Sequence, residues 1–139
     1  MYEDFSYIYD KLSFDIEYEK YARNILGLVE KNNIKKDKML ELAAGSGMLS
    51  KYFFDEFKEI DALDISTDML NVFAQKHDND NVNLIYYDMV EYENPAAYDL
   101  IVILLDSINY VTNPKDLEKL IANCYKNLKE NGLLVLDIN

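Results

Sequence analysis

The sequence predicts an α/β fold in which helices cover both faces of a parallel sheet. Short apolar segments alternate along the chain with segments of helical periodicity, so each predicted strand is followed by a crossover long enough to hold a helix. The segment from Tyr98 to Leu105 is almost continuously apolar, which is typical of a central parallel strand buried on both faces. Each predicted strand also brings an acidic residue to its carboxyl end, which predicts one polar rim.

Size, composition and charge favour a single soluble, cytoplasmic domain. The 139 residues are 50% hydrophobic and 29% charged. The longest apolar run is about six residues, far short of a membrane span, and no secretory signal is recognisable. The net charge of −12 disfavours nucleic acid as a partner, because DNA and RNA repel an acidic surface. The single cysteine, Cys124, cannot form an internal disulfide, which favours a reducing compartment.

The first third of the chain is predicted to hold an aromatic tail, a helix and a strand. Residues 1–14 are rich in tyrosine and phenylalanine but lack a regular period. From Asp15, a plausible N-cap, apolar residues recur at helical spacing until Asn32 and Asn33 end the pattern. A strand at Met39–Leu42 follows.

The middle third is predicted to continue as helix, strand, helix and strand. We expect a helix from about Ser46 to Phe57 and a strand at Glu59–Asp64. Ser66 is placed to cap the next helix, and a strand at Val82–Tyr87 follows a polar turn at residues 78–81. The apolar face expected for the capped helix consists of Met69, Leu70, Phe73 and Ala74.

The last third is predicted to hold a loop at residues 91–97, the central strand, a helix and a final strand. Asn113 and Pro114 form a good helix start, and Gly132 is expected to end that helix as its C′ residue. The expected buried stripe of the helix is Leu117, Leu120, Ile121, Cys124 and Leu128. The strand at Leu133–Ile138 would expose an apolar edge, which predicts self-association or cover by a further segment.

A glycine turn and a spaced carboxylate predict a cofactor that contains a nucleoside. Gly45 and Gly47 lie between the first strand and the helix expected after it, where a ligand can approach the main chain closely. Asp64 ends the next strand, at the position from which a carboxylate can accept hydrogen bonds from both ribose hydroxyls. A tight turn followed by an ordinary Asp before a helix cap is the structural alternative.

The residues around this turn favour a sulfonium cofactor over a dinucleotide. A dinucleotide fingerprint needs a third glycine three residues after the second, and Ser50 occupies that position. Glu41 directly before the turn would repel a pyrophosphate but would suit the ammonium and sulfonium groups of S-adenosylmethionine. A nicotinamide cofactor is therefore the less favoured alternative.

The sequence from residue 39 to residue 47, MLELAAGSG, resembles the first motif of Rossmann-like S-adenosylmethionine-dependent methyltransferases. Residues 63–70 resemble their second motif and residues 87–89 their third. Residues 105–110 resemble a segment common in the bacterial small-molecule branch of that family. Tyr7–Asp10, with Tyr18 in the following helix, is similar to the aromatic lead-in of the same branch.

The resemblance implies a three-layer Rossmann-like methyltransferase core with sheet order 3-2-1-4-5. We expect one domain over residues 1–139, in which residues 1–33 form an aromatic tail and lid helix and residues 37–139 form the core. Two further strands of the family, 6 and 7, have no counterpart in this sequence. Because family members build much of the acceptor pocket from that part, the resemblance predicts cofactor binding more directly than turnover.

The resemblance also implies roles for individual residues toward the cofactor. Glu41 would help to hold its amino group, Asp64 its ribose hydroxyls and Asp88 its adenine amino group. Ala43 stands where the family more often has glycine, which is tolerable if its φ is negative. The full implied cofactor-binding set is Tyr9, Tyr18, Glu41, Ala43, Gly45, Gly47, Asp64, Ile65, Met69, Asp88, Met89 and Leu105.

The activity implied is methyl transfer to a nitrogen or oxygen atom of a small molecule. Asp106, Asn109 and Tyr110 are the residues expected to position the acceptor. The structural alternative for Asp106, capping of the backbone after the fourth strand, is somewhat favoured over that role. His77 is expected at the end of a surface helix rather than in catalysis, and no Cys/His cluster offers a metal site. The alternative function is a non-catalytic cofactor-binding module that pairs through its fifth strand.

Overall fold

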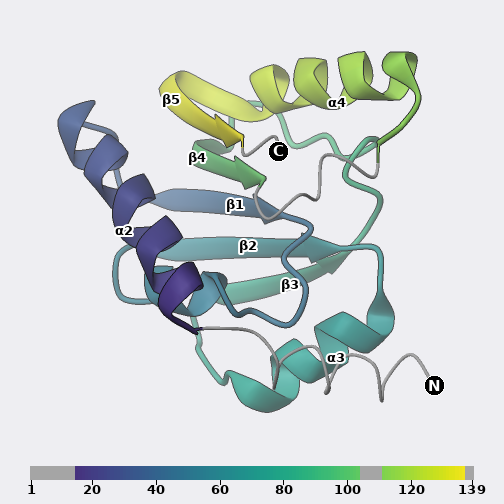
Figure 1. Cartoon of the computed structure of the whole chain (residues 1–139). Helices are drawn as coiled ribbons and strands as arrows, with labels where there is room; N and C mark the ends of the chain where they lie inside the picture. Colours follow the sequence, from purple (N-terminus) through teal and green to yellow (C-terminus); the bar gives the residue numbers. More distant parts are fainter. Residues whose placement is uncertain (1–14, 104–110, 137–139) are drawn as a thin grey trace.

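The structure, a computed structural model, describes residues 15–103 and 111–136 (Figure 1). It confirms the predicted alternation of helices and strands. The elements are α2 (Asp15–Lys31), β1 (Lys38–Leu42), the 3-10 helix η1 (Ser50–Phe53), β2 (Glu59–Asp64), α3 (Thr67–Lys76), β3 (Val82–Tyr86), β4 (Tyr98–Ile103), α4 (Pro114–Asn127) and β5 (Leu128–Leu136).

The strands form one parallel sheet in the order β3-β2-β1-β4-β5, which confirms the predicted order. Leu42, the last residue of β1, is level with Leu63 of β2 and with Ile103 of β4. The carboxyl ends of these central strands therefore lie at the same edge of the sheet, on the right-hand side of Figure 1. This is the edge at which doubly wound sheets bind ligands.

Two apolar cores lie on opposite faces of the sheet and give the fold its three layers. On one face, α2 and η1 pack against Met39, Ile60, Leu100 and Val102, which are all almost fully buried. Phe73 of α3 packs against Ala62 on the same face. On the other face, α4 packs against Leu40, Leu42, Ile101 and Ile103. No helix in the described parts of the chain is long and apolar enough to cross a membrane.

The helix expected over residues 46–57 is not continuous, which is a correction to the prediction. Gly47 has a φ of +89°, outside the right-handed helical region, and only Ser50–Phe53 form a short 3-10 helix. The Tyr52 N–H bonds to the Leu49 carbonyl three residues earlier, the spacing of 3-10 geometry. The segment is held by packing, because Leu49 and Phe53 are buried in the core beneath α2.

Ser66 caps α3 as predicted: its side chain accepts a hydrogen bond from the Met69 N–H at 3.1 Å. The apolar face of the helix differs from the prediction in one position. Val72 is buried and Ala74 is exposed. Phe73 packs between the glycine turn and β2, and Val72 rather than Ala74 is buried beside it.

The carboxyl end of α4 corrects two further predictions. The helix ends at Asn127, and β5 begins at Leu128 rather than at the predicted Leu133. Gly132 therefore lies inside the strand and is not a helix C′ residue. The pairing of β5 with β4 jumps between Tyr98–Leu128 and Leu100–Leu133, which leaves an irregularity that contains Gly132. A Cβ atom there would lie 2.9 Å from the Lys129 carbonyl oxygen, so the close chain approach explains the glycine.

The buried face of α4 is partly polar rather than the predicted apolar stripe. Leu117 is exposed, whereas Asn123 and Asn127 are buried one turn apart. The Asn123 amide donates to the Val90 carbonyl at 2.8 Å. Asn127 donates to the Tyr92 carbonyl at 3.1 Å and accepts from the Asn94 N–H at 2.7 Å. These bonds attach the loop after β3 to α4.

Substituting Asn127→Ala is expected to lower the free energy of unfolding by about 2 kcal/mol, because it leaves the part-buried Tyr92 carbonyl and Asn94 N–H without the partner that Asn127 supplies. Lys126→Ala is the matched control. Its ammonium pairs with Glu93 at 2.6 Å on the surface, and such pairs contribute less than about 1 kcal/mol. Urea denaturation of both variants measures the difference, and equal values would contradict the role given to Asn127.

Candidate functional site

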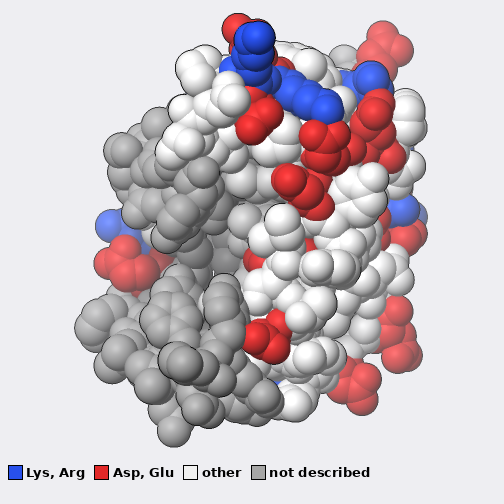
Figure 2. Space-filling model, turned by 90° about the vertical axis from the view of Figure 1, so that its right-hand side faces the viewer, with Lys and Arg blue, Asp and Glu red and all other residues white. Residues whose placement is uncertain are grey.

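The predicted glycine turn lies at the carboxyl edge of the sheet, directly after β1. Figure 2 looks onto this edge and shows Asp and Glu side chains exposed at several places on the described part of its surface. The Ala44 N–H bonds to the Leu63 carbonyl at 2.9 Å, which ties the turn to the end of β2. The turn and the end of β2 therefore form one unit.

Asp64 is the residue that links this unit through its side chain. One carboxylate oxygen accepts a hydrogen bond from the Gly45 N–H at 2.8 Å, and the other accepts from the Ser66 N–H at 2.9 Å. Each carboxylate oxygen has two lone pairs, so each can accept one more hydrogen bond. Asp64 is half-buried at the rim, so the remaining acceptor positions can bind paired hydroxyl groups.

The two glycines of the turn both have positive φ but face different surroundings. Gly45 has a φ of +60°, and a Cβ atom added to it would meet nothing within 4 Å among the described residues, so this face of the turn leaves room for a ligand. Gly47 has a φ of +89°, and a Cβ atom there would lie 2.8 Å from ring atoms of Phe73 and His77. Gly45 therefore provides the open cradle, and Gly47 allows close packing of the turn on α3.

Ala43 also has a positive φ, of +58°. The condition under which alanine would replace glycine without strain, a negative φ, is therefore not met. A left-handed conformation is strained by about 1–2 kcal/mol for a residue with a Cβ atom. Ala43 therefore adopts a left-handed conformation that glycine would adopt without strain.

Glu41 lies under the turn, on β1, and its side chain is 4% exposed. The Ser50 hydroxyl donates a hydrogen bond to its carboxyl oxygen at 2.5 Å. Burial is the main cause that raises the Glu41 pKa to about 8, and the charge of Asp64 raises it further, while the Ser50 hydrogen bond opposes the shift. The site therefore holds two carboxyl groups in different environments, one buried and one at the rim.

The residues predicted to surround an adenine follow β2 and β3, at the carboxyl edge of the sheet. The Tyr87 N–H bonds to the Asp64 carbonyl at 3.2 Å, so the segment after β3 runs beside the end of β2. Ile65 is 64% exposed there and offers an uncovered apolar surface. Asp88 is exposed, with one carboxylate oxygen accepting from the Val90 N–H at 2.9 Å. Met69 and Met89 are half-buried.

The remaining predicted site residues are either buried in the core or outside the described ranges. Tyr18 is 7% exposed and packs in the apolar core that α2 forms with η1 and the sheet. Its role toward a cofactor stays a prediction. The other predicted residues lie outside the described ranges: Tyr9, Leu105, Asp106, Asn109 and Tyr110.

Three residues important to the turn were not identified from the sequence. Ser50 supplies the hydrogen bond to Glu41, and Phe73 and His77 form the surface against which Gly47 packs. His77 stacks edge-on against Phe54 and Phe73 with ring centroids 5.4 Å apart in both pairs. The sequence carries no signal for these contacts, because they depend on how the turn lies on α3.

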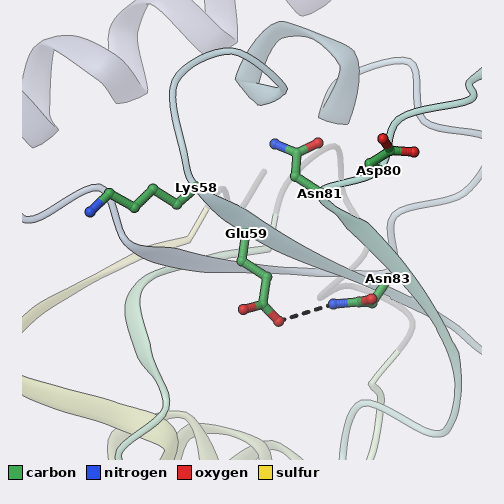
Figure 3. Close-up of a pocket in the computed structure, with 5 residues that line it drawn as sticks. All are labelled: Lys58, Glu59, Asp80, Asn81 and Asn83. Atoms are coloured by element: carbon green, nitrogen blue, oxygen red, sulfur yellow. Dashed lines mark hydrogen bonds between the residues drawn. The ribbon is translucent and has the colours of Figure 1, made fainter.

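A shallow surface depression at the opposite edge of the sheet has a different character (Figure 3). It has a volume of about 390 Å³ and lies at the amino ends of β2 and β3. Its polar side chains serve the fold: Glu59 accepts from Asn83 at 3.0 Å, and Asn81 donates to the Phe54 and Phe57 carbonyls at 2.8 and 3.0 Å. The depression is therefore not the predicted site.

The fold and the turn define an α/β domain with a nucleoside-type cradle at the carboxyl edge of its sheet. The model of the methyltransferase domain family matches residues 40–134, which span β1 through most of β5. The chain therefore belongs to the methyltransferase domain family.

Individual relatives agree with this assignment. A solved S-adenosylmethionine-dependent methyltransferase from Clostridium acetobutylicum ATCC 824 superimposes with a TM-score of 0.83 at 33% identity, covering 99% of this chain and 57% of that one. An N,N-dimethyltransferase of dTDP-3-amino-3,4,6-trideoxy-alpha-D-glucopyranose from Streptomyces venezuelae is 27% identical over 99% of this chain and 58% of its own length. The solved glycopeptide N-methyltransferase MtfA, in complex with S-adenosylmethionine, has a TM-score of 0.73 at 26% identity over 85% of this chain and 48% of its own. The chain spans about half the length of the curated relatives it matches.

Substituting Gly47→Ala is expected to lower the free energy of unfolding by about 2–4 kcal/mol, through overpacking against Phe73 and His77 added to backbone strain. Gly45→Ala is the matched control. It carries similar strain but no clash, so its loss should be about 1–2 kcal/mol. Thermal or urea unfolding compares the two, and a smaller loss for Gly47→Ala than for Gly45→Ala would contradict the packing assigned to Gly47.

Substituting Glu41→Gln is expected to change how stability depends on pH. The Glu41 pKa of about 8 in the folded chain exceeds its ordinary value of 4.5, so the folded state binds the proton more tightly than the unfolded state. This contribution is fully present below about pH 4.5 and is lost as the pH rises to about 8, by up to about 1.4 kcal/mol per pH unit. Denaturation at pH 5, 6, 7 and 8 should show wild type losing stability relative to Glu41→Gln. A constant difference would contradict the raised pKa.

Proposed function

We propose that this chain provides the cofactor-binding core of an S-adenosylmethionine-dependent methyltransferase. The observation that carries the proposal is the double hydrogen bonding of Asp64 to the Gly45 and Ser66 N–H groups. It fixes the carboxylate beside the open face of Gly45 and leaves an acceptor position on each oxygen. Paired ribose hydroxyls fit such an arrangement.

The chemistry of the site supports a sulfonium cofactor rather than a dinucleotide. Glu41 is buried beneath the turn and Asp64 lies at its rim, so two carboxyl groups approach the bound ligand. The Asp64 carboxylate would repel a pyrophosphate but attract a cationic ligand, and a bound cation would also favour the ionised form of Glu41. When bound, S-adenosylmethionine supplies an activated methyl group on a sulfonium sulfur. We assign Ile65 and Met69 to the adenine ring, and Asp88 and the Met89 backbone to its polar edge.

For the acceptor, we propose a nitrogen or oxygen atom of a small molecule. The names of similar proteins support this class, since they include an aminosugar N,N-dimethyltransferase and a glycopeptide N-methyltransferase. The acidic charge of the chain, −12, also suits an amine acceptor better than a phosphate-rich one. Asp106, Asn109 and Tyr110 are proposed to position that acceptor, with alignment as the main contribution of the protein.

A second candidate is a cofactor-binding module that acts through a partner surface on β5. The observation that favours it is the position of β5 at the end of the sheet order, with its residues only half-buried from Leu133 to Leu136. Further chain or a second copy could pair there. A methyl-release assay with an amine acceptor distinguishes this module from an enzyme.

Substituting Asp64→Asn is expected to weaken S-adenosylmethionine binding by about 10- to 100-fold, since hydrogen bonds to a charged group contribute about 1.5–3 kcal/mol. Asp80→Asn is the matched control. It makes the same charge change at the opposite edge of the sheet (Figure 3) and should leave the affinity unchanged. Titration calorimetry measures both, and an unchanged affinity for Asp64→Asn would contradict the proposed ribose contact. An absence of binding to wild type at 1 mM ligand, about the weakest affinity worth testing, would contradict the proposed cofactor.

A further inference from the structure

Glu41 has an environment that the proposed roles leave unexplained. A buried carboxyl group is normally paired with a cation or bonded by several donors when it is ionised. The hydrogen bond described for Glu41 comes from the neutral hydroxyl of Ser50, at 2.5 Å. Its side chain is 4% exposed, and the residues level with it on the neighbouring strands are Ala62 and Val102. These surroundings favour a neutral carboxylic acid.

The nearest charge, that of Asp64, also favours the neutral form of Glu41. Asp64 is the charged group that raises the Glu41 pKa through the field, and it adds to the larger effect of burial. Other titratable or charged residues lie on the elements packed around Glu41. They are Tyr18 of α2, Lys51 of η1, and Lys76 and His77 at the end of α3. None of these four is among the causes that shift the Glu41 pKa.

A cationic ligand at the open face of Gly45 would shift the Glu41 carboxyl group from its neutral form to its ionised form. Asp64 would then have its remaining acceptor positions filled, and a positive charge would lie within the same low-dielectric region as Glu41. An added cation favours the ionised form of a carboxyl group, whereas Asp64 alone favours the neutral form. Burial would also strengthen the attraction, because solvent screens it little there.

We propose that Glu41 carries a proton in the ligand-free chain and loses it when a sulfonium ligand binds beside Asp64. The balance is simple: the Glu41 O–H bond breaks, the electron pair stays on the carboxylate, and the proton goes to solvent as the cation enters. This inference rests on the proposed function, since it takes S-adenosylmethionine as the cation. It makes Glu41 a positioning residue that senses ligand charge.

A consequence is discrimination between two ligands that differ in charge at sulfur. S-adenosylmethionine has a sulfonium, whereas S-adenosylhomocysteine has a neutral thioether and the same ammonium and carboxylate groups. Glu41 should release more of its proton for the first ligand than for the second. Since each released proton makes affinity pH-dependent, the preference for the sulfonium form should rise with pH up to about 8.

Titration calorimetry of the full chain at pH 7 in phosphate and in Tris tests this, because the heat difference between buffers counts released protons. The ligands are S-adenosylmethionine, S-adenosylhomocysteine and 5′-methylthioadenosine, which has no ammonium group. For wild type we expect release of roughly 0.5–0.9 proton with the first, less with the second and none with the third. Glu41→Gln should bind S-adenosylmethionine with heats that do not depend on the buffer.

The outcomes separate this inference from the proposed function. Binding of S-adenosylmethionine to wild type with buffer-independent heat would overturn the inference and leave the cofactor in place. Equal proton release by wild type and Glu41→Gln would also overturn it. If neither protein binds S-adenosylmethionine at any pH from 6 to 9, a window around the ordinary titration range of the site, the proposed function itself fails.

Discussion

The pair of hydrogen bonds from the Gly45 and Ser66 N–H groups to Asp64 is the interaction on which the site depends. Through them one carboxylate joins the turn after β1 to the start of α3. Backbone donors in a turn and at a helix start need acceptors, and Asp64 satisfies both while still facing the rim. The ligand cradle and the helix cap thus share one residue.

The same turn is constrained from beneath and from the side. Gly47 packs against Phe73 and His77, and Glu41 is held by Ser50 below it. Three consecutive odd-numbered positions, Ala43, Gly45 and Gly47, have left-handed backbone. Such a chain path is stable only where surrounding contacts specify it, and strain of this kind is concentrated at ligand sites.

Apolar periodicity was sufficient to place β1 to β4, and the resemblance was sufficient for the order of the strands in the sheet. The residues assigned to the cofactor stay predictions. Contacts between residues far apart in the sequence were harder to predict. The segment after Gly47 has enough apolar residues for a helix, yet tertiary packing replaced most of it with turns and a 3-10 helix. Asn123 and Asn127 are polar residues that bind a loop in the folded chain, so an apolar pattern could not identify the buried face of α4. A left-handed Ala43 likewise contradicts residue preference.

The attachment of the loop at residues 90–94 to α4 also connects the rim of the site to that helix. Asp88 precedes that loop on the cofactor side, and its carboxylate bonds to the Val90 N–H while the Val90 carbonyl accepts from Asn123. The path from Asp88 to α4 therefore consists of direct hydrogen bonds. Val90 thereby connects the rim at Asp88 to α4, which packs on the face of the sheet that α2 does not cover.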